Sequence, residues 1–178
     1  MLVRGDRTLA GSRAERDFCA EPADNAGRCG GGDPTRAGSA GARAPDAGED
    51  YTALAKKFPT PPASAGIVFD GDEGRLTEAA FLRDFASDVP QAQARVLYAV
   101  QQPFHKALLT GKTKHAAWRS KPSFYAVSTE DRTINPDLER FMAKRMGATT
   151  IEVKASHLSL ISHPKEITDL ILQAAGRT

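Results

Sequence analysis

This sequence has little cysteine, no long apolar run and almost no net charge, and each shortage argues against a class of protein. Cys19 and Cys29 are its only cysteines, and no second pair or suitably spaced histidine accompanies them. Free thiols are therefore favoured over the alternatives, a loop disulfide or half of a zinc site, and we expect no metal and no cofactor. No stretch approaches about 18 apolar residues, and the first residues hold no apolar run of about seven, so we expect neither a membrane span nor a secretory signal.

The charge of the chain is nearly balanced, with a formal net charge of +2. This balance argues against nucleic acid as a partner. The densest group of basic residues, Lys112, Lys114, Arg119 and Lys121, is more typical of a solvated loop face than of a phosphate-binding patch. The expected location is the cytoplasm.

The first fifty residues differ in composition from the rest of the chain. All seven basic residues there are arginine, and between Ala10 and Asp50 the only large apolar residue is Phe18. Such a segment cannot bury enough apolar surface to offset its conformational entropy, so we expect residues 1–43 to be disordered. Because the composition is typical of GC-rich DNA read out of frame, our hypothesis is a frame-shifted segment; a genuine low-complexity linker is the alternative.

Two short β-prone stretches are each followed by a residue suited to acid–base chemistry. Residues 123–127 lead into a loop with Asp131, and residues 149–153 lead into a loop with His157. The interval between Asp131 and His157 leaves room for one helix and one strand. This predicts neighbouring parallel strands with both groups at their carboxyl ends. There a carboxylate can accept from one imidazole nitrogen and leave the other free to act as a base.

Helical patterns occupy most of the remaining chain. Pro90 predicts a helix start, and the four-residue spacing of Ala92, Val96 and Val100 predicts the buried stripe of that helix. The other predicted helices cover residues 49–57, 77–85, 104–109, 136–146 and 164–175, with a small strand at 67–69.

Several of these stretches resemble the α/β-hydrolase family, of the small-esterase and hydroxynitrile-lyase-like kind. The matching stretches are residues 44–49, 57–62, 118–122, 129–134, 140–148 and 156–164. The resemblance implies an α/β class chain with a partial α/β-hydrolase fold: a helical cap at 44–121, and at 122–178 the last two parallel strands with their helices. It also implies that Asp131 is the acid and His157 the base of a catalytic triad.

The third member of such a triad is a serine that precedes the acid along the chain, on a strand-to-helix turn of the form Gly-x-Ser-x-Gly. Ser39, in Ala-Gly-Ser-Ala-Gly, has the small neighbours, but no apolar strand leads into it and no apolar helix follows. Ser12 and Ser64 are weaker candidates. We therefore expect the nucleophile to be missing.

The resemblance implies carboxylic-ester hydrolysis by a Ser-His-Asp triad, and the missing serine predicts that this chain is inactive. A small-molecule ester is the expected substrate if the chain is active. The alternatives are a lyase-type member of the family and a non-catalytic pseudo-enzyme or interaction fragment. We also expect self-association through an exposed sheet edge, because the neighbours of the strand at Phe124 would come from the scrambled segment.

Overall fold

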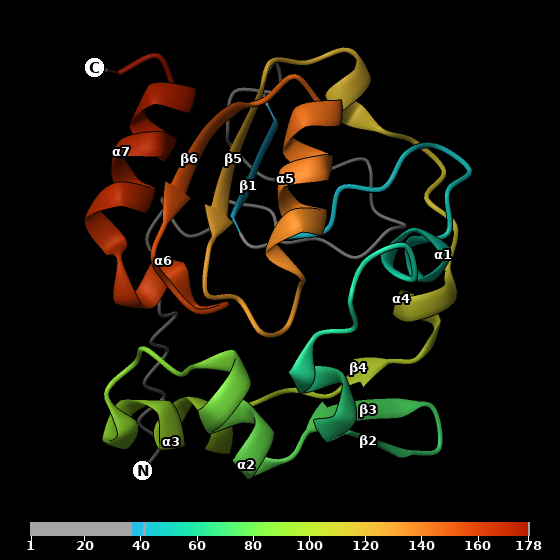
Figure 1. The fold of residues 1–178 in the computed structure, drawn as a ribbon, viewed down its shortest axis with the longest axis vertical. Helices are drawn as coiled ribbons and strands as arrows, with labels where there is room; N and C mark the ends of the chain where they lie inside the picture. Colours follow the sequence, from blue (N-terminus) through green and yellow to red (C-terminus); the bar gives the residue numbers. More distant parts are fainter. Residues whose placement is uncertain (1–36, 41, 178) are drawn as a thin grey trace, which may run out of the picture.

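The computed structural model describes residues 37–40 and 42–177, without the side chains of 37–40. Cys19, Cys29 and Ser12 lie outside this part of the chain, as does most of the segment 1–43. The described chain forms two three-stranded sheets, one in strand order β1-β5-β6 and one in order β2-β3-β4 (Figure 1).

The first sheet is parallel and carries the strands that precede Asp131 and His157. Its central strand, β5 (Ser123–Ser128), pairs with β6 (Thr149–Val153) on one side and with β1 (Ala37–Ala40) on the other. Four of the six residues of β5 have almost no exposed surface, as expected for a strand covered on both faces. The predicted pair of neighbouring parallel strands is confirmed.

Strand β1 was not expected from the sequence. It lies inside the segment 1–43 and runs parallel to β5, with Ser39 opposite Tyr125. The predicted unpaired edge at the Phe124 strand is therefore wrong, because β1 pairs along the side of β5 that was expected to be open. A Gly/Ala/Ser stretch has no large apolar side chains to mark it as a strand in the sequence, although its backbone can pair as well as any other.

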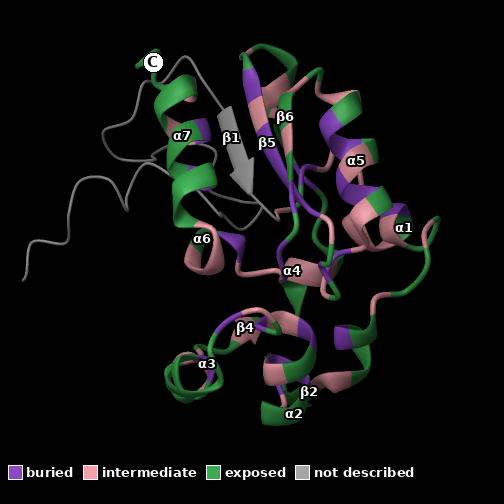
Figure 2. Cartoon of the chain, turned by 60° about the vertical axis from the view of Figure 1, so that its left-hand side comes forward, coloured by how far each residue is buried: buried purple, intermediate pink, exposed green. Residues whose placement is uncertain are grey.

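Helices cover both faces of the parallel sheet (Figures 1 and 2). Helix α5 (Pro136–Arg145) packs on one face and α7 (Pro164–Ala174) on the other, and the short α6 (Ser159–Ser162) precedes α7. Successive side chains of β5 point to opposite faces of the sheet, as in any β-strand. Tyr125 and Val127 join the cluster beneath α5, while Ala126 joins the cluster beneath α7.

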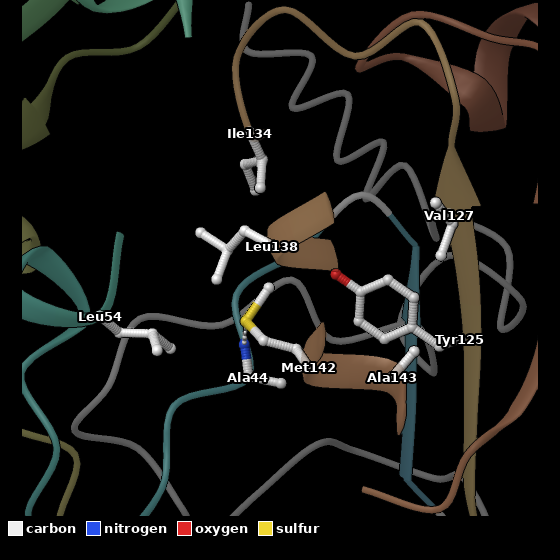
Figure 3. Close-up of a cluster of buried hydrophobic side chains, with 8 residues drawn as sticks. All are labelled: Ala44, Leu54, Tyr125, Val127, Ile134, Leu138, Met142 and Ala143. Atoms are coloured by element: carbon white, nitrogen blue, oxygen red, sulfur yellow. Dashed lines mark hydrogen bonds between the residues drawn. The ribbon is translucent and has the colours of Figure 1, made fainter. Parts of the chain in front are cut away.

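The cluster beneath α5 ties the start of the cap to the core. Its members, shown in Figure 3, are Ala44, Leu54, Tyr125, Val127, Ile134, Leu138, Met142 and Ala143. Met142 is fully buried, and the Ala44 N–H lies 3.3 Å from its sulfur. The α5 helix that presents Met142 begins where the sequence predicted: the Asn135 side chain accepts from the Asp137 N–H at 2.9 Å, which caps the first turn.

The region 44–121 is less regular than the helical cap that the sequence predicted. It contains the antiparallel sheet β2 (Ile67–Asp70), β3 (Glu73–Leu76) and β4 (Phe104–His105). Gly71, with φ of 59°, allows the tight turn between β2 and β3. The helical elements are α1 (Tyr51–Ala55), η2 (Pro62–Gly66), α2 (Glu78–Ala80), η3 (Phe81–Phe85), α3 (Gln91–Ala99), α4 (Ala107–Thr110) and η4 (Ala117–Arg119).

Helix α3 begins at the predicted place but buries a different face. Val96 and Val100 are 64% and 62% exposed, whereas Ala94 is 1% exposed. Ala94 belongs to the buried hydrophobic cluster of the cap, against which Leu97 and Tyr98 also pack. The predicted stripe is therefore wrong. A small alanine can approach the rest of the cap closely, and the large Tyr98 side chain beside it supplies the contact with Phe81 at 5.7 Å between ring centroids.

Candidate active site

The site lies where β5 and β6 end and their loops meet. Backbone hydrogen bonds join the two loops: the Thr129 N–H donates to the Val153 carbonyl at 2.9 Å, and the Glu130 N–H to the Ala155 carbonyl at 3.1 Å. These bonds continue the β5–β6 pairing past the ends of the strands. The acid loop and the histidine loop are therefore held as one unit.

This unit places Asp131 and His157 in direct contact. Asp131 Oδ2 lies 2.6 Å from His157 Nδ1, and the Asp131 side chain has no exposed surface. The other oxygen, Oδ1, accepts from the backbone N–H groups of Thr133 at 2.6 Å and Ile134 at 2.9 Å. The structure thus brings together the two residues that the sequence singled out, and three hydrogen bonds fix the orientation of the carboxylate.

The imidazole of His157 is only partly buried. Its side chain is 18% exposed, and the Phe85 ring lies against it with centroids 4.7 Å apart. Since Nδ1 faces a carboxylate, the neutral ring carries its proton on Nδ1 and presents a lone pair at Nε2. Nε2 makes no hydrogen bond within the described part of the chain, so it is available to accept a proton from a nucleophile or water.

A short stretch of the cap, Asp84 to Asp88, contacts both loops, and we call it the clamp segment. Asp84 is fully buried and accepts from Arg83 at 2.6 Å and from Arg132, next to the acid, at 2.8 Å. These two guanidinium groups, Arg83 above all, lower the pKa of Asp84 although burial raises it. The acid loop is therefore tied to the cap through an ion pair between the half-exposed Arg132 and the buried Asp84 carboxylate.

The other end of the clamp segment holds the histidine loop. Asp88 accepts from the Ser156 N–H at 2.9 Å and from the Ser156 hydroxyl, and that hydroxyl also lies 3.2 Å from the Phe85 carbonyl. Burial raises the pKa of Asp88, but the hydrogen bonds from Ser156 outweigh it and leave the pKa lowered. Residue 156 directly precedes His157, so the cap positions the base as well as the acid.

Glu139 is a site residue that sequence reasoning missed. It lies on α5 with no exposed surface, and its Oε2 accepts from the N–H of Ser128, the last residue of β5, at 2.9 Å. Burial, and next the neighbouring Asp131 carboxylate, raise the pKa of Glu139 to about 10. The one signal in the sequence was its place one helical turn before the buried Met142 and Ala143.

Of the candidate serines, Ser39 and Ser64 belong to the described part of the chain, and neither lies on a strand-to-helix turn there. Ser39 is the third residue of β1, inside a strand, and the next helix in the described chain is α1, which starts at Tyr51. The side chain of Ser39 is not described. Ser64 is exposed in η2. Among the described side chains, no serine hydroxyl forms a hydrogen bond with the His157 ring.

The surface beside the acid is hollowed. A depression of about 420 Å³ is lined by Ser87, Thr129, Glu130, Asp131 and Arg132. Within residues 37–40 and 42–177 there is no group of three or more His, Cys, Asp or Glu that could hold a metal ion. No helix in that same part of the chain is both long enough and apolar enough to cross a membrane.

A parallel sheet covered by helices, with an acid and a histidine at the ends of its last two strands, defines an α/β protein of the layered kind. A model of the alpha/beta hydrolase family matches residues 8–170, so the chain belongs to this family. The match to the family model begins at residue 8, whereas the resemblance described from the sequence began at Ala44.

Solved structures with this fold include several esterases and hydrolases. Polyneuridine aldehyde esterase is 15% identical with a TM-score of 0.62, over 78% of this chain and 61% of that one. The pyrethroid hydrolase PytH is 17% identical with a TM-score of 0.62, over 80% and 61%. A methylesterase from Arabidopsis is 11% identical with a TM-score of 0.60, over 80% and 59%. At these identities the likeness shows the fold alone.

The chain spans about three fifths of the length of these solved structures. None of the curated proteins matches it.

Proposed function

We propose that this chain carries the cap and the acid–base part of a carboxylic-ester hydrolase, with Asp131 as the acid and His157 as the base. We further propose that it lacks the nucleophile and does not turn over esters by itself. The observation that carries the proposal is the 2.6 Å contact between Asp131 Oδ2 and His157 Nδ1, while Nε2 makes no hydrogen bond to the described residues. An ester is the proposed substrate class because solved structures of this fold carry the names esterase and methylesterase.

The geometry supports a definite role for each group. His157 Nε2 would accept the proton of an attacking serine, and the Nδ1–H bond to Asp131 would hold the ring in the required tautomer and stabilise the imidazolium. The same imidazolium would then protonate the departing alcohol, and a water molecule activated by Nε2 would release the acid. The Thr133 and Ile134 N–H groups also donate to the Asp131 carboxylate and help to stabilise its negative charge.

Catalysis also needs a nucleophile and donors for the oxyanion, and in this family both come from the strand-to-helix turn and a loop before it. An acid–base pair without that serine has nothing to activate. Loss of the serine from a related triad removes roughly 10⁶-fold of the catalysed rate. The proposed inactivity is supported by the position of Ser39 within β1, because the next helix of the described chain does not begin until Tyr51.

A serine-reactive fluorophosphonate probe tests the missing nucleophile. We expect no serine to be labelled faster than in the His157→Ala variant, when the modified peptides are counted by mass spectrometry. Labelling of one serine that disappears in His157→Ala would identify a nucleophile and overturn the proposed inactivity. The same result would support the role proposed for His157.

The frame-shift hypothesis for residues 1–43 is tested at the DNA level. We expect one of the other two frames upstream of Ala44 to encode an apolar strand followed by a Gly-x-Ser-x-Gly turn. A chain joined in that frame to residues 44–178 should hydrolyse a short-chain nitrophenyl ester. If neither frame encodes such a turn, the hypothesis is wrong and the segment is a genuine part of the protein.

A further inference from the structure

A second buried carboxyl group lies behind the acid–base pair. The Glu139 side chain reaches from α5 to the end of β5, where its Oε2 accepts the Ser128 N–H at 2.9 Å. Its Oε1 is shielded from solvent and has no hydrogen-bond partner in the described part of the chain. A buried carboxylate oxygen without a donor is costly, whereas a buried carboxylic O–H needs only an acceptor.

Asp131 can provide that acceptor. It is one of the groups that act on Glu139, through both its charge and a side-chain contact. Among the described residues, Asp131 Oδ1 accepts two backbone N–H groups, whereas Oδ2 accepts only from His157 and has a lone pair to spare. Two carboxyl groups that share a buried site do not both ionise, and the one with more donors keeps the charge. Asp131 has three donors and Glu139 has one.

We propose that Glu139 is a neutral carboxylic acid in the folded chain and positions Asp131 by donating its Oε1 proton to the Asp131 carboxylate. The N–H of Ser128 and the O–H of Glu139 then link β5, α5 and the acid loop in one chain of hydrogen bonds. This inference concerns the folded chain and does not rest on ester hydrolysis.

The other polar groups around Glu139 do not remove the need for this proton. The Tyr125 hydroxyl donates to the Ala42 carbonyl at 2.5 Å, and burial raises the pKa of both Tyr51 and Tyr125. The guanidinium of Arg140 binds Asp137 and Glu152 on the exposed side of α5. No cation of the described chain forms a hydrogen bond or ion pair with Glu139.

The pH dependence of stability tests the protonation state. The unfolded chain loses the Glu139 proton above pH about 4.5, whereas the folded chain keeps it until about pH 10. The folded chain therefore binds one more proton in this window, and each pH unit raises the unfolding equilibrium constant up to about tenfold. In Glu139→Gln, which keeps the shape and cannot ionise, this contribution is absent.

We expect the ratio of the unfolding constants of the wild type and Glu139→Gln to rise roughly tenfold per pH unit between pH 6 and pH 9. The matched control is Glu152→Gln, because Glu152 is an exposed carboxylate with a lowered pKa due to its Arg140 partner. Its ratio should stay constant over the same range. A ratio for Glu139→Gln that is as flat as the control would overturn the proposal.

Spectroscopy tests the proton and the positioning separately. At pH 8 the wild type and Glu152→Gln should show the infrared C=O band of a protonated carboxyl, and Glu139→Gln should lack it. The downfield NMR signal of the His157 Nδ1 proton should remain in Glu139→Gln, whose amide still donates to Asp131, and shift or vanish in Glu139→Leu. Absence of the infrared band in the wild type would contradict the neutral Glu139. An unchanged NMR signal in Glu139→Leu would contradict its positioning role.

Discussion

The parallel sheet and the cap are built from the same chain, yet they bury their residues very differently. In the sheet, β5 is covered by α5 on one face and α7 on the other, and most of its side chains are inaccessible. In the cap, alanines supply much of the buried cluster, while Val68 and Phe69 of β2 are about half exposed. The acid and the base lie at the end of the well-covered sheet. The cap reaches them through Asp84 and Asp88, through the Phe85 ring on His157, and through Leu158 and Ile161, which pack against the buried residues of the cap. The comparison separates a sheet that is buried on both faces from a cap that leaves much of its own small sheet exposed.

The largest expected change in the free energy of unfolding comes from the packed core beneath α5. Met142→Ala, in the fully buried cluster beneath α5, should lower the free energy of unfolding by about 2–5 kcal/mol, because it leaves a cavity in the core. Val96→Ala, on the exposed face of α3, should change it by less than about 0.5 kcal/mol. Chemical denaturation measures both. Equal losses would mean that the cap and the core are packed alike.

The sequence predicted the core much better than the cap. Two short β-prone stretches lead into the loops with Asp131 and His157, and one helix lies between them. This order favours one arrangement, two neighbouring parallel strands. In the cap, the elements are short and the hydrophobic spacing was misleading, since Val96 and Val100 point outward and Ala94 points inward. A single small alanine such as Ala94 gives no periodic signal, although close packing makes its side of α3 the buried one.

The contacts between the cap and the two loops of the site could not be read from the sequence. Asp84 meets Arg132 across 48 positions, and Asp88 meets Ser156 across 68. Strand β1 was missed because its four small residues carry no apolar pattern and pair through the backbone alone. Glu139 was missed because a glutamate on a helix is normally exposed, and only the packing of α5 against β5 buries it.

An intermediate loss of stability is expected when the contact of Asp84 with the acid loop is removed. Asp84→Ala removes a buried carboxylate that accepts from Arg83 and Arg132, and it should cost about 1–3 kcal/mol at pH 7. The folded pKa of Asp84 is lowered from 3.8, so its stabilisation is present above that pH and is lost as the pH falls through the folded pKa. Denaturation of the wild type and Asp84→Ala at pH 7 and pH 3 should show the difference shrinking in acid.

The control for that experiment is Arg83→Ala, which keeps the ion pair between Asp84 and Arg132 and should cost less than Asp84→Ala. Hydrogen exchange adds a local test, since Asp84→Ala should speed the exchange of the Thr133 and Ile134 amides that bind Asp131. If these amides exchange at the wild-type rate, the cap does not hold the acid loop.

The smallest of the stability effects concerns the start of α5. Asn135→Ala removes the side-chain cap on the Asp137 N–H and should cost about 1 kcal/mol. Asn135→Asp, which can accept the same hydrogen bond, should retain most of the stability. A thermal melt of the three proteins measures the order, and an alanine variant as stable as the wild type would show that the cap adds nothing to the packing of this helix.

The most direct test of the central claim is ester turnover by the chain and its His157→Ala variant. The acid–base pair is in place, with Asp131 Oδ2 and His157 Nδ1 2.6 Å apart, and among the described side chains no serine hydroxyl forms a hydrogen bond with the His157 ring. With a short-chain nitrophenyl ester at pH 8, we expect the same rate from the wild type and from His157→Ala. A wild-type rate more than about tenfold above that of His157→Ala would contradict the account, because it would require a nucleophile that His157 activates.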